Sequence, residues 1–247
     1  MSFETRWLGR LGYSDAMERM RAWVDERARG ERADTLFTLE HPPVITLGRN
    51  ARVSHLLATP ERLGELGVEV HETTRGGDIT FHGPGQLVGY GIVNLRERRI
   101  GPVTYMRVLE EACIRAARRY GVESGRRDGM TGVWTPRGKL VAMGVRFERG
   151  VTSHGFAFNV RTDLKFFDLI VPCGLAGEPV TSLELLTGSA PPLEELGQVV
   201  AAELERALDE AAGAAAGLDA RAAEAEPGGG AGTLAGRESS APEETLK

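Results

Sequence analysis

The sequence predicts an α+β fold, in which helices pack on one side of a mixed sheet. Helix-period and strand-period segments are mixed along the chain without the regular strand–helix alternation of a parallel α/β sheet. The 247 residues, 41% of them apolar and 26% charged, have the composition of an ordinary globular protein. We therefore expect one large folded domain.

Apolar residues recurring every three or four positions predict three main helices. The first spans about residues 14–29, with Ser14 as a plausible N-cap and Met17, Met20 and Trp23 on one face. The second spans residues 102–120, and the third follows Pro191-Pro192 to about residue 210. A short helix is expected after Thr59-Pro60, because proline is favoured in the first helical turn.

Short apolar runs bounded by glycine and proline predict the strands. His41-Pro42-Pro43 separates the first two, since no central strand contains such a sequence. A meander follows the second long helix, with turns at residues 136–138 and 148–150. The predicted strands are residues 36–39, 44–47, 68–71, 133–134, 139–147 and 152–160.

The C-terminal segment differs in composition from the rest of the chain. Residues 212–247 are mostly Ala, Gly, Glu and Pro, with no aromatic residue. Such a segment buries too little apolar surface to offset the entropy lost on ordering. We expect a folded catalytic domain at residues 1–211 and a disordered tail at residues 212–247.

Composition excludes several classes of protein. The net charge is −5, and the sequence contains no basic stripe of the kind that would predict nucleic-acid binding. No apolar stretch reaches the roughly 18 residues of a membrane span, and charges throughout the first 30 residues argue against a signal peptide. We expect a cytoplasmic protein without a membrane partner. Five scattered histidines and two cysteines show no metal-ligand spacing.

Three segments depart from ordinary core or surface composition. Residues 75–86 hold four glycines, which suit either a tight turn or a binding loop. Lys139 opens an otherwise apolar strand in a chain that uses 27 arginines and only three lysines. Cys173 lies between Pro172 and Gly174, where a thiol is reachable, whereas Cys113 falls on an apolar helix face and is interpreted as core.

Cys173 is therefore the candidate nucleophile, and it needs a group that makes it a thiolate. His82, His154 and Lys139 are candidates, and spacing alone does not separate them. Either histidine could equally be a satisfied core residue that orders a turn. Asp78 is interpreted as a turn-capping residue.

Three sequence blocks together resemble the lipoyl(octanoyl) transferase family, which transfers octanoyl groups from acyl carrier protein to proteins. They are RGGDITFHGPGQLVGY at residues 75–90, GVWT through KLVAMGVRFERGVTSHGFAFNV at residues 132–160, and IVPCGL with VTSLE at residues 170–184. The resemblance covers about residues 5–210 and not the tail. It implies the α+β catalytic domain of biotin and lipoate protein ligases.

The resemblance also implies roles for individual residues. Cys173 matches the acyl-thioester cysteine, and Lys139 matches its acid/base partner. Phe81 and Ala142 stand where the family commonly has Tyr and Ser. His154 would support the site. Three runs match the substrate-binding segments: Arg75, Gly76, Gly77, Asp78, Ile79, Thr80, Phe81 and His82; Ala142, Met143 and Gly144; Gly155, Phe156 and Ala157.

The implied reaction begins endogenous lipoate biosynthesis. The donor would be octanoyl-acyl carrier protein. The acceptors would be lysines of the lipoyl domains of 2-oxoacid dehydrogenases and of the glycine cleavage H protein. The octanoyl group would pass from the donor to Cys173 and then from Cys173 to the acceptor lysine. Such a covalent intermediate predicts ping-pong kinetics. No ATP, metal or redox cofactor is implied, and Lys139 would act either as a neutral base or as the cation of an ion pair.

Three alternatives remain at this stage. A lipoate or biotin ligase of the same fold would form an acyl-adenylate and require ATP. A related octanoyltransferase would act between lipoyl proteins. A non-enzymatic binding domain would explain the glycines but not Cys173 together with Lys139.

Carrier proteins are acidic, so arginine clusters offer candidate docking charges. The candidates are Arg96, Arg98, Arg99, Arg118, Arg119, Arg126 and Arg127.

Overall fold

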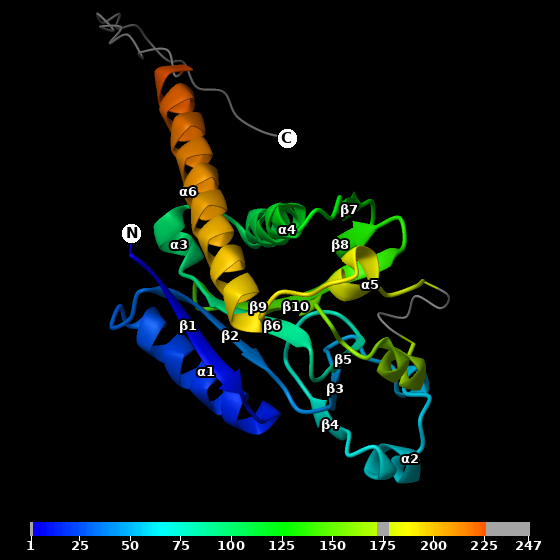
Figure 1. The fold of residues 1–247 in the computed structure, drawn as a ribbon. Coiled ribbons are helices and arrows are strands. Elements are labelled where there is room, and N and C mark those ends of the chain that lie inside the picture. The colour runs from blue at the N-terminus through cyan, green and yellow to red at the C-terminus, as the bar shows by residue number, and fades with distance from the viewer. Residues whose placement is uncertain (1, 172–177, 226–247) are drawn as a thin grey trace, which may run out of the picture.

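A seven-stranded mixed sheet forms the centre of the protein (Figure 1). The computed structural model describes residues 2–171 and 178–225, with side chains through residue 217. In spatial order the strands are β1 (Phe3–Arg10), β2 (Asp34–Glu40), β6 (Gln86–Ile92), β10 (Val151–Asn159), β9 (Gly138–Glu148), β8 (Met130–Thr135) and β7 (Gly125–Arg127). β1 and β2 are parallel, and the other neighbours are antiparallel. The predicted α+β class is confirmed.

A second, three-stranded sheet lies beside the first. Its order is β4 (Glu69–Glu72), β3 (Val44–Leu47) and β5 (Ile79–His82). The short helix α2 (Pro60–Glu65) is capped by the Thr59 hydroxyl, as the Thr-Pro sequence predicts. With the 3₁₀ helices η1 (Val53–His55) and η2 (Leu164–Leu169), these elements enclose a separate small apolar cluster.

Helices cover both faces of the large sheet, so the prediction of helices on one side is wrong. α1 (Tyr13–Ala28) packs on one face, while α4 (Pro102–Arg119) and α6 (Leu193–Ala225) pack on the other (Figure 1). Two shorter helices, α3 (Leu95–Arg98) and α5 (Leu183–Thr187), complete the fold. Along β10, Phe156 and Phe158 point to the α4 and α6 side and Ala157 points to α1. Strands that are buried on both faces lack the alternation of apolar and polar residues. The sequence of these strands therefore did not show which faces of the sheet the helices cover.

β6 was not predicted as a strand because it contains Gly89 and Gly91, and glycine weakens a strand interior. The structure explains both residues by close packing. A Cβ atom at Gly89 would lie 2.3 Å from the Phe156 ring, and one at Gly91 would lie 2.2 Å from the Tyr105 hydroxyl. The glycines therefore admit aromatic rings from neighbouring elements against the backbone.

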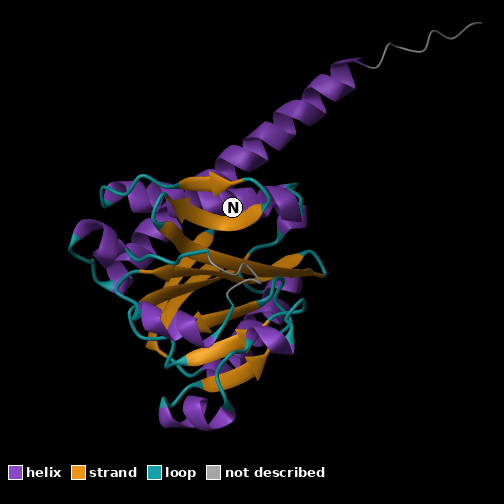
Figure 2. Ribbon diagram, turned by 90° about the vertical axis from the view of Figure 1, so that its right-hand side faces the viewer, coloured by secondary structure: helices purple, strands orange, loops and turns teal. Residues whose placement is uncertain are grey.

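The last helix is longer than predicted. α6 continues to Ala225, whereas the sequence placed its end near residue 210 and a disordered tail from residue 212. Alanine loses no side-chain entropy in a helix, so an alanine-rich segment can stay helical without burying apolar surface. The distal part of α6 projects away from the body (Figure 2). Residues 226–247 lie outside the described part, and for them the predicted tail stays a prediction.

Deleting residues 213–247 should change the melting temperature by less than about 3 °C, because a loss of 1 kcal/mol corresponds to about 2–4 °C in a chain of this size. The reason is that Ala211 is the last residue packed against the main core among the α6 residues whose side chains are described. Thermal unfolding of the full and shortened chains measures the difference. A larger fall would mean that the distal helix contributes packing to the body.

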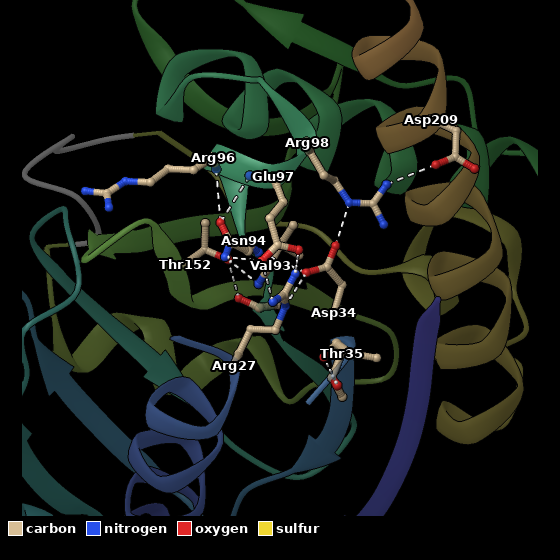
Figure 3. A network of polar contacts seen from close by, with 12 residues as sticks. Arg27, Asp34, Thr35, Val93, Asn94, Arg96, Glu97, Arg98, Thr152 and Asp209 are labelled. Atoms are coloured by element: carbon tan, nitrogen blue, oxygen red, sulfur yellow. Dashed lines mark hydrogen bonds and ion pairs between the residues drawn. The ribbon is translucent and has the colours of Figure 1, made fainter. Parts of the chain in front are cut away.

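Buried ion pairs join the ends of four elements (Figure 3). The Asp34 carboxylate accepts from Arg27 Nε at 2.9 Å and from Arg98 Nε at 2.6 Å, and its side chain is fully buried. Arg98 also contacts Asp209 at 2.9 Å, which connects β2 and α3 to α6. Arg98 is therefore a structural residue, and its predicted role as a docking charge is wrong.

Asp34→Asn should lower the free energy of unfolding by about 3–5 kcal/mol, because it removes the buried carboxylate that Arg27 and Arg98 share and leaves these guanidinium groups with only their more exposed partners, Glu97 and Asp209. Denaturant titration measures the change. As a matched control, Glu31→Gln removes the partner of an exposed arginine and should leave the unfolding midpoint unchanged. Equal midpoints for both variants would show that the Asp34 network contributes little.

Among the described helices, none combines the length and the apolar character that a membrane span requires.

Candidate active site

Two adjoining cavities lie over β9 and β10, beside the glycine-rich segment that precedes β5. One is a narrow pocket of about 40 Å³ with a mostly apolar lining. The other is a cleft of about 550 Å³, within the range typical of ligand sites. Gly77, Asp78, Met143 and Gly144 line both cavities, so the two are contiguous.

The structure brings the three predicted substrate-binding runs together. Strands β9 and β10 pair in a register that places Gly144 opposite Gly155 and Ala142 opposite Ala157. The first run joins them because the Gly76 amide donates to the Val145 carbonyl at 3.0 Å. All of the predicted substrate-binding residues except Gly76 and Phe81 line the narrow pocket.

The two exceptions have different explanations. Gly76 lines the cleft instead of the pocket. Phe81 is a core residue of the small sheet, where its ring stacks on Phe166 with centroids 4.7 Å apart. Side chains alternate along β5, so Thr80 and His82 face the pocket and Phe81 does not.

Glycine is required at Gly144 because the glycine-rich segment crosses β9 in contact with its backbone. A Cβ atom at Gly144 would lie 2.7 Å from the Gly76 carbonyl oxygen. Any side chain there would lift the segment away from the strand. The close contact explains why the glycines of two distant motifs occur together.

Arg75 is buried and holds this segment in place. Its Nη2 donates to the Thr46 carbonyl at 2.7 Å and to the Thr46 hydroxyl at 2.8 Å, and its Nη1 donates to the Gly76 carbonyl at 3.0 Å. The guanidinium also lowers the pKa of His82 and of His154. Arg75 therefore positions the pocket wall and adds positive charge beside it.

Three buried histidines lie at or behind the pocket. Desolvation lowers the pKa of His41 to about 4 and those of His82 and His154 to about 3, so all three are neutral at pH 7. His41 Nδ1 faces the Leu11 carbonyl at 2.8 Å and must donate, which leaves Nε2 to accept from the Tyr90 hydroxyl at 2.9 Å.

The hydrogen bonds of His82 fix its tautomer in the same way. The Gln86 amide nitrogen donates to Asn159 at 2.9 Å, so the Gln86 oxygen accepts from His82 Nδ1 at 2.8 Å. His82 Nε2 is then an acceptor. This interpretation places a hydrogen-bond acceptor, and no charge, in the pocket wall.

His154 is conformationally unusual. Its φ of 59° lies in the left-handed region, which non-glycine residues seldom adopt. Its amide contacts Met20 Sδ at 3.2 Å, and its buried Nε2 has no hydrogen-bond partner in the described part of the protein. A strained residue with an unsatisfied polar atom in a pocket wall is typical of a functional position.

The histidines should make stability fall in mild acid. Their pKa values are lowered in the folded protein, so the unfolded chain binds protons first as the pH drops below about 6.5. Each histidine should therefore remove up to about 1.4 kcal/mol of stability per pH unit between pH 6.5 and the folded values near 3–4. Denaturant titrations at pH 7, 6 and 5 measure this slope. Equal stability at pH 7 and pH 5 would contradict the neutral buried cluster.

Lys139 lies at the start of β9 and lines the cleft. Its side chain is buried, and its Nζ lies 4.6 Å from the centroid of the Trp134 ring. The backbone of Lys139 accepts from the Thr181 amide at 3.0 Å and donates to the Pro179 carbonyl at 2.9 Å. The segment that follows residue 177 is thus attached directly to Lys139.

Cys173 lies outside the described residues, in the interval 172–177. Both flanks of that interval are fixed at the cleft. On one side the Val171 amide donates to the His55 carbonyl at 2.8 Å, and on the other Pro179 pairs with Lys139. His55 and Lys139 both line the cleft.

Cys113 is fully buried on α4, as predicted, and burial strongly raises the pKa of its thiol. Asp78 has the predicted turn-capping role, since its Oδ1 accepts from the Ile79 amide at 2.8 Å. Its Oδ2 lies 2.5 Å from His55 Nδ1. In the described part of the chain, no group of three or more His, Cys, Asp or Glu side chains could hold a metal ion.

Sequence reasoning missed Tyr13, His41 and Tyr90. Tyr13 and Tyr90 line the narrow pocket, and His41 supports Tyr90 from behind. They come from α1, the loop after β2, and β6, and only tertiary contacts join them to the glycine-rich segment. His41 was considered only as part of a Pro-rich break between strands.

Comparisons with known proteins agree with this geometry. The profile of the lipoyl protein ligase A/B catalytic domain matches residues 12–205. The chain belongs to the lipoyl protein ligase A/B catalytic domain family. An octanoyltransferase of Acidobacterium capsulatum is 53% identical over 191 residues, which cover 72% of this chain and 78% of the relative. An octanoyltransferase of Koribacter versatilis is 50% identical over 198 residues, with 78% and 79% covered.

Solved structures confirm the fold of this family. A bipartite lipoate protein ligase from Thermoplasma acidophilum superposes with a TM-score of 0.61 at 17% identity, covering 85% of this chain and 84% of the other. The biotin protein ligase of Aquifex aeolicus superposes with a TM-score of 0.52 at 12% identity, covering 83% and 70%. The predicted ligase-like fold, family and enzyme class, an octanoyltransferase, are confirmed.

Proposed function

We propose that this protein transfers an octanoyl group from octanoyl-acyl carrier protein to a lysine of lipoyl domains through a thioester on Cys173. The observation that carries the proposal is that the described residues on either side of the Cys173 interval, Val171 and Pro179, are hydrogen-bonded to the cleft residues His55 and Lys139. Octanoyltransferase relatives at about half identity support the acyl group. The acceptors are lipoyl domains of 2-oxoacid dehydrogenases and the glycine cleavage H protein.

The first half-reaction acylates the enzyme. The Cys173 thiolate attacks the octanoyl carbonyl carbon, a new C–S bond forms, and the C–S bond to the carrier thiol breaks. The released carrier thiolate takes a proton from Lys139. One thioester replaces another, so this step is close to energetically neutral.

The second half-reaction forms an amide. The neutral amine of the acceptor lysine attacks the thioester, the Cys173 thiolate leaves, and Lys139 receives the proton that the amine loses. A lysine suits this role because desolvation readily tunes its pKa, whereas arginine does not release its proton. The amide is more stable than the thioester, which drives transfer forward.

The two cavities suit different parts of the donor. The narrow, mostly apolar pocket would accept the alkyl chain, and the larger cleft, which has a mixed polar and apolar lining and contains Lys139, would hold the thioester and its thiol-bearing arm. His82 and His154 line the pocket as neutral groups. The part of the pocket wall that α1 and β10 form would therefore limit the length of the alkyl chain that fits.

Transfer from octanoyl-carrier protein to a purified lipoyl domain, in the absence of ATP, tests the proposal. A ligase, which the fold neighbours make the main alternative, would produce no octanoyl-lysine without ATP. A transferase between lipoyl proteins would use octanoylated H protein as donor faster than the carrier protein. Faster transfer from the carrier protein without ATP is the expected result.

A further inference from the structure

We infer that Arg52, with Arg49 beside it, binds the phosphate at the far end of the donor's pantetheine arm. This inference rests on the proposed thioester donor and names the part of that donor that the cleft recognises. The basic turn, residues 49–52, connects β3 to η1. Arg52 lines the cleft together with Asn50, and Lys139 lines the same cleft.

Backbone hydrogen bonds attach the basic turn to the glycine-rich segment of the site. The Gly48 amide donates to the Asp78 carbonyl, and the Asn50 amide donates to the Gly77 carbonyl, each at 3.1 Å. The Arg49 amide donates to the Arg75 carbonyl, also at 3.1 Å. The turn is therefore fixed by its backbone, while both arginine side chains remain exposed.

Neither guanidinium of the basic turn forms an ion pair within the described residues. The other arginines near the cleft differ in this respect. Arg107 and Arg126 both contact the buried Glu110, and Arg127 contacts Glu178. Arg126 and Arg127, predicted as docking charges, are thus already paired. Unlike these three arginines, Arg49 and Arg52 are exposed and have no carboxylate partner among the described residues, so their charge is available to a ligand.

The charges that line the cleft favour an anion beside Arg52. Asp78 is the acidic residue among the described residues that line the cleft, and its carboxylate is occupied: Oδ1 accepts from the Ile79 and Arg52 amides, and Oδ2 contacts His55. Lys139 also lines the cleft, and the thioester is expected there. A donor whose phosphate binds at Arg52 and whose thioester lies at Lys139 would therefore occupy this one cleft.

A phosphate is the anion that fits an exposed pair of arginines best. Guanidinium groups bind phosphate oxygens with two parallel hydrogen bonds, which fix orientation as well as charge. A pantetheine arm on a carrier protein carries a phosphodiester at the end opposite its thiol, and coenzyme A carries a diphosphate at that position. Both donors share this chemistry.

The test compares octanoyl-phosphopantetheine with octanoyl-pantetheine as donors, since these differ only in the phosphate. For the unmodified enzyme we expect kcat/KM to be about 10-fold higher with the phosphate, the lower range for a hydrogen-bonded charge. In Arg49→Gln/Arg52→Gln the ratio should fall to about 1, while the rate with octanoyl-pantetheine stays unchanged. In a variant that keeps Arg49→Gln but carries Arg52→Lys, the ratio should be partly restored relative to the double glutamine variant.

The matched control is Arg62→Gln, an exposed arginine on α2 that pairs with Glu65. It should keep the ratio of the unmodified enzyme. A ratio near 1 in the unmodified enzyme, an unchanged ratio in the double variant, or an equal fall in the control would each overturn the inference.

Two further donors identify the source of the phosphate. If the arginines bind the phosphate itself, the double substitution should slow octanoyl-CoA and octanoyl-carrier protein by similar factors. A loss confined to the carrier protein, with an unchanged ratio for the two small donors, would mean contact with the carrier's protein surface and would overturn a phosphate site. Absence of transfer from every thioester would instead refute the proposed function.

Discussion

Cys173→Ser should abolish both the acyl-enzyme and octanoyl transfer, with a loss on the order of 10³-fold or more. A serine hydroxyl is not ionised near neutral pH, so it is a far weaker nucleophile than a thiolate. Single-turnover acylation with octanoyl-carrier protein and steady-state transfer to a lipoyl domain measure the two effects separately. Both should fall to the background rate.

The chain provides a matched control in its other cysteine. Cys113 is fully buried on α4 and packs in the main core. Cys113→Ser should leave both half-reactions intact and lower stability by about 1–3 kcal/mol, the cost of burying a hydroxyl without a good partner. If both variants fold and both lose acylation and transfer to the same extent, Cys173 is not the specific nucleophile.

Lys139→Arg and Lys139→Met should both slow transfer by about 10²–10⁴-fold, the usual effect of removing a positioned proton-transfer group. Arginine keeps the positive charge but releases no proton near neutral pH. Separate measurement of acylation and of transfer to the acceptor shows which step depends on the proton.

Lys165 supplies the control for this pair of variants, since it is an exposed lysine on η2. Lys165→Met should retain the full rate. A purely electrostatic role for Lys139 would appear as substantial activity in the Arg variant and loss in the Met variant. Near-normal rates for both variants in both steps would remove Lys139 from the mechanism.

Local sequence signals predicted the helices that have clear boundaries. Thr59-Pro60 begins α2, and the apolar period of residues 102–120 matches α4 almost to its ends. The strands of the meander were also predicted, because turns with glycine separate β8, β9 and β10. These elements are determined by neighbouring residues, which is the information a single sequence contains.

Features that depend on distant contacts were not predicted. β6 was not predicted because Gly89 and Gly91 are unfavourable inside a strand. Glycine is needed at these two positions because the side chains of Phe156 and Tyr105 pack against the backbone there. The length of α6 was missed because a lack of large apolar residues was interpreted as disorder, although alanine favours helix.

The candidate site was predicted through sequence blocks that resemble a family. The structure adds how those blocks meet: the Gly76 amide binds Val145, and the strand register joins Gly144 to Gly155. It also adds His41 and Tyr90, whose contact spans 49 positions of sequence and has no local signal. The neutral state of the three histidines follows from burial, which is a tertiary property.

Intact mass measurement of the protein after incubation with octanoyl-carrier protein, without ATP and without acceptor, tests the thioester mechanism most directly. The proposed function predicts one octanoyl group per chain, located on Cys173 by peptide mapping, removed by hydroxylamine and transferred to a lipoyl domain when one is added. An unmodified chain that nevertheless transfers octanoyl to the lipoyl domain, or an octanoyl group on any residue other than Cys173, would contradict it.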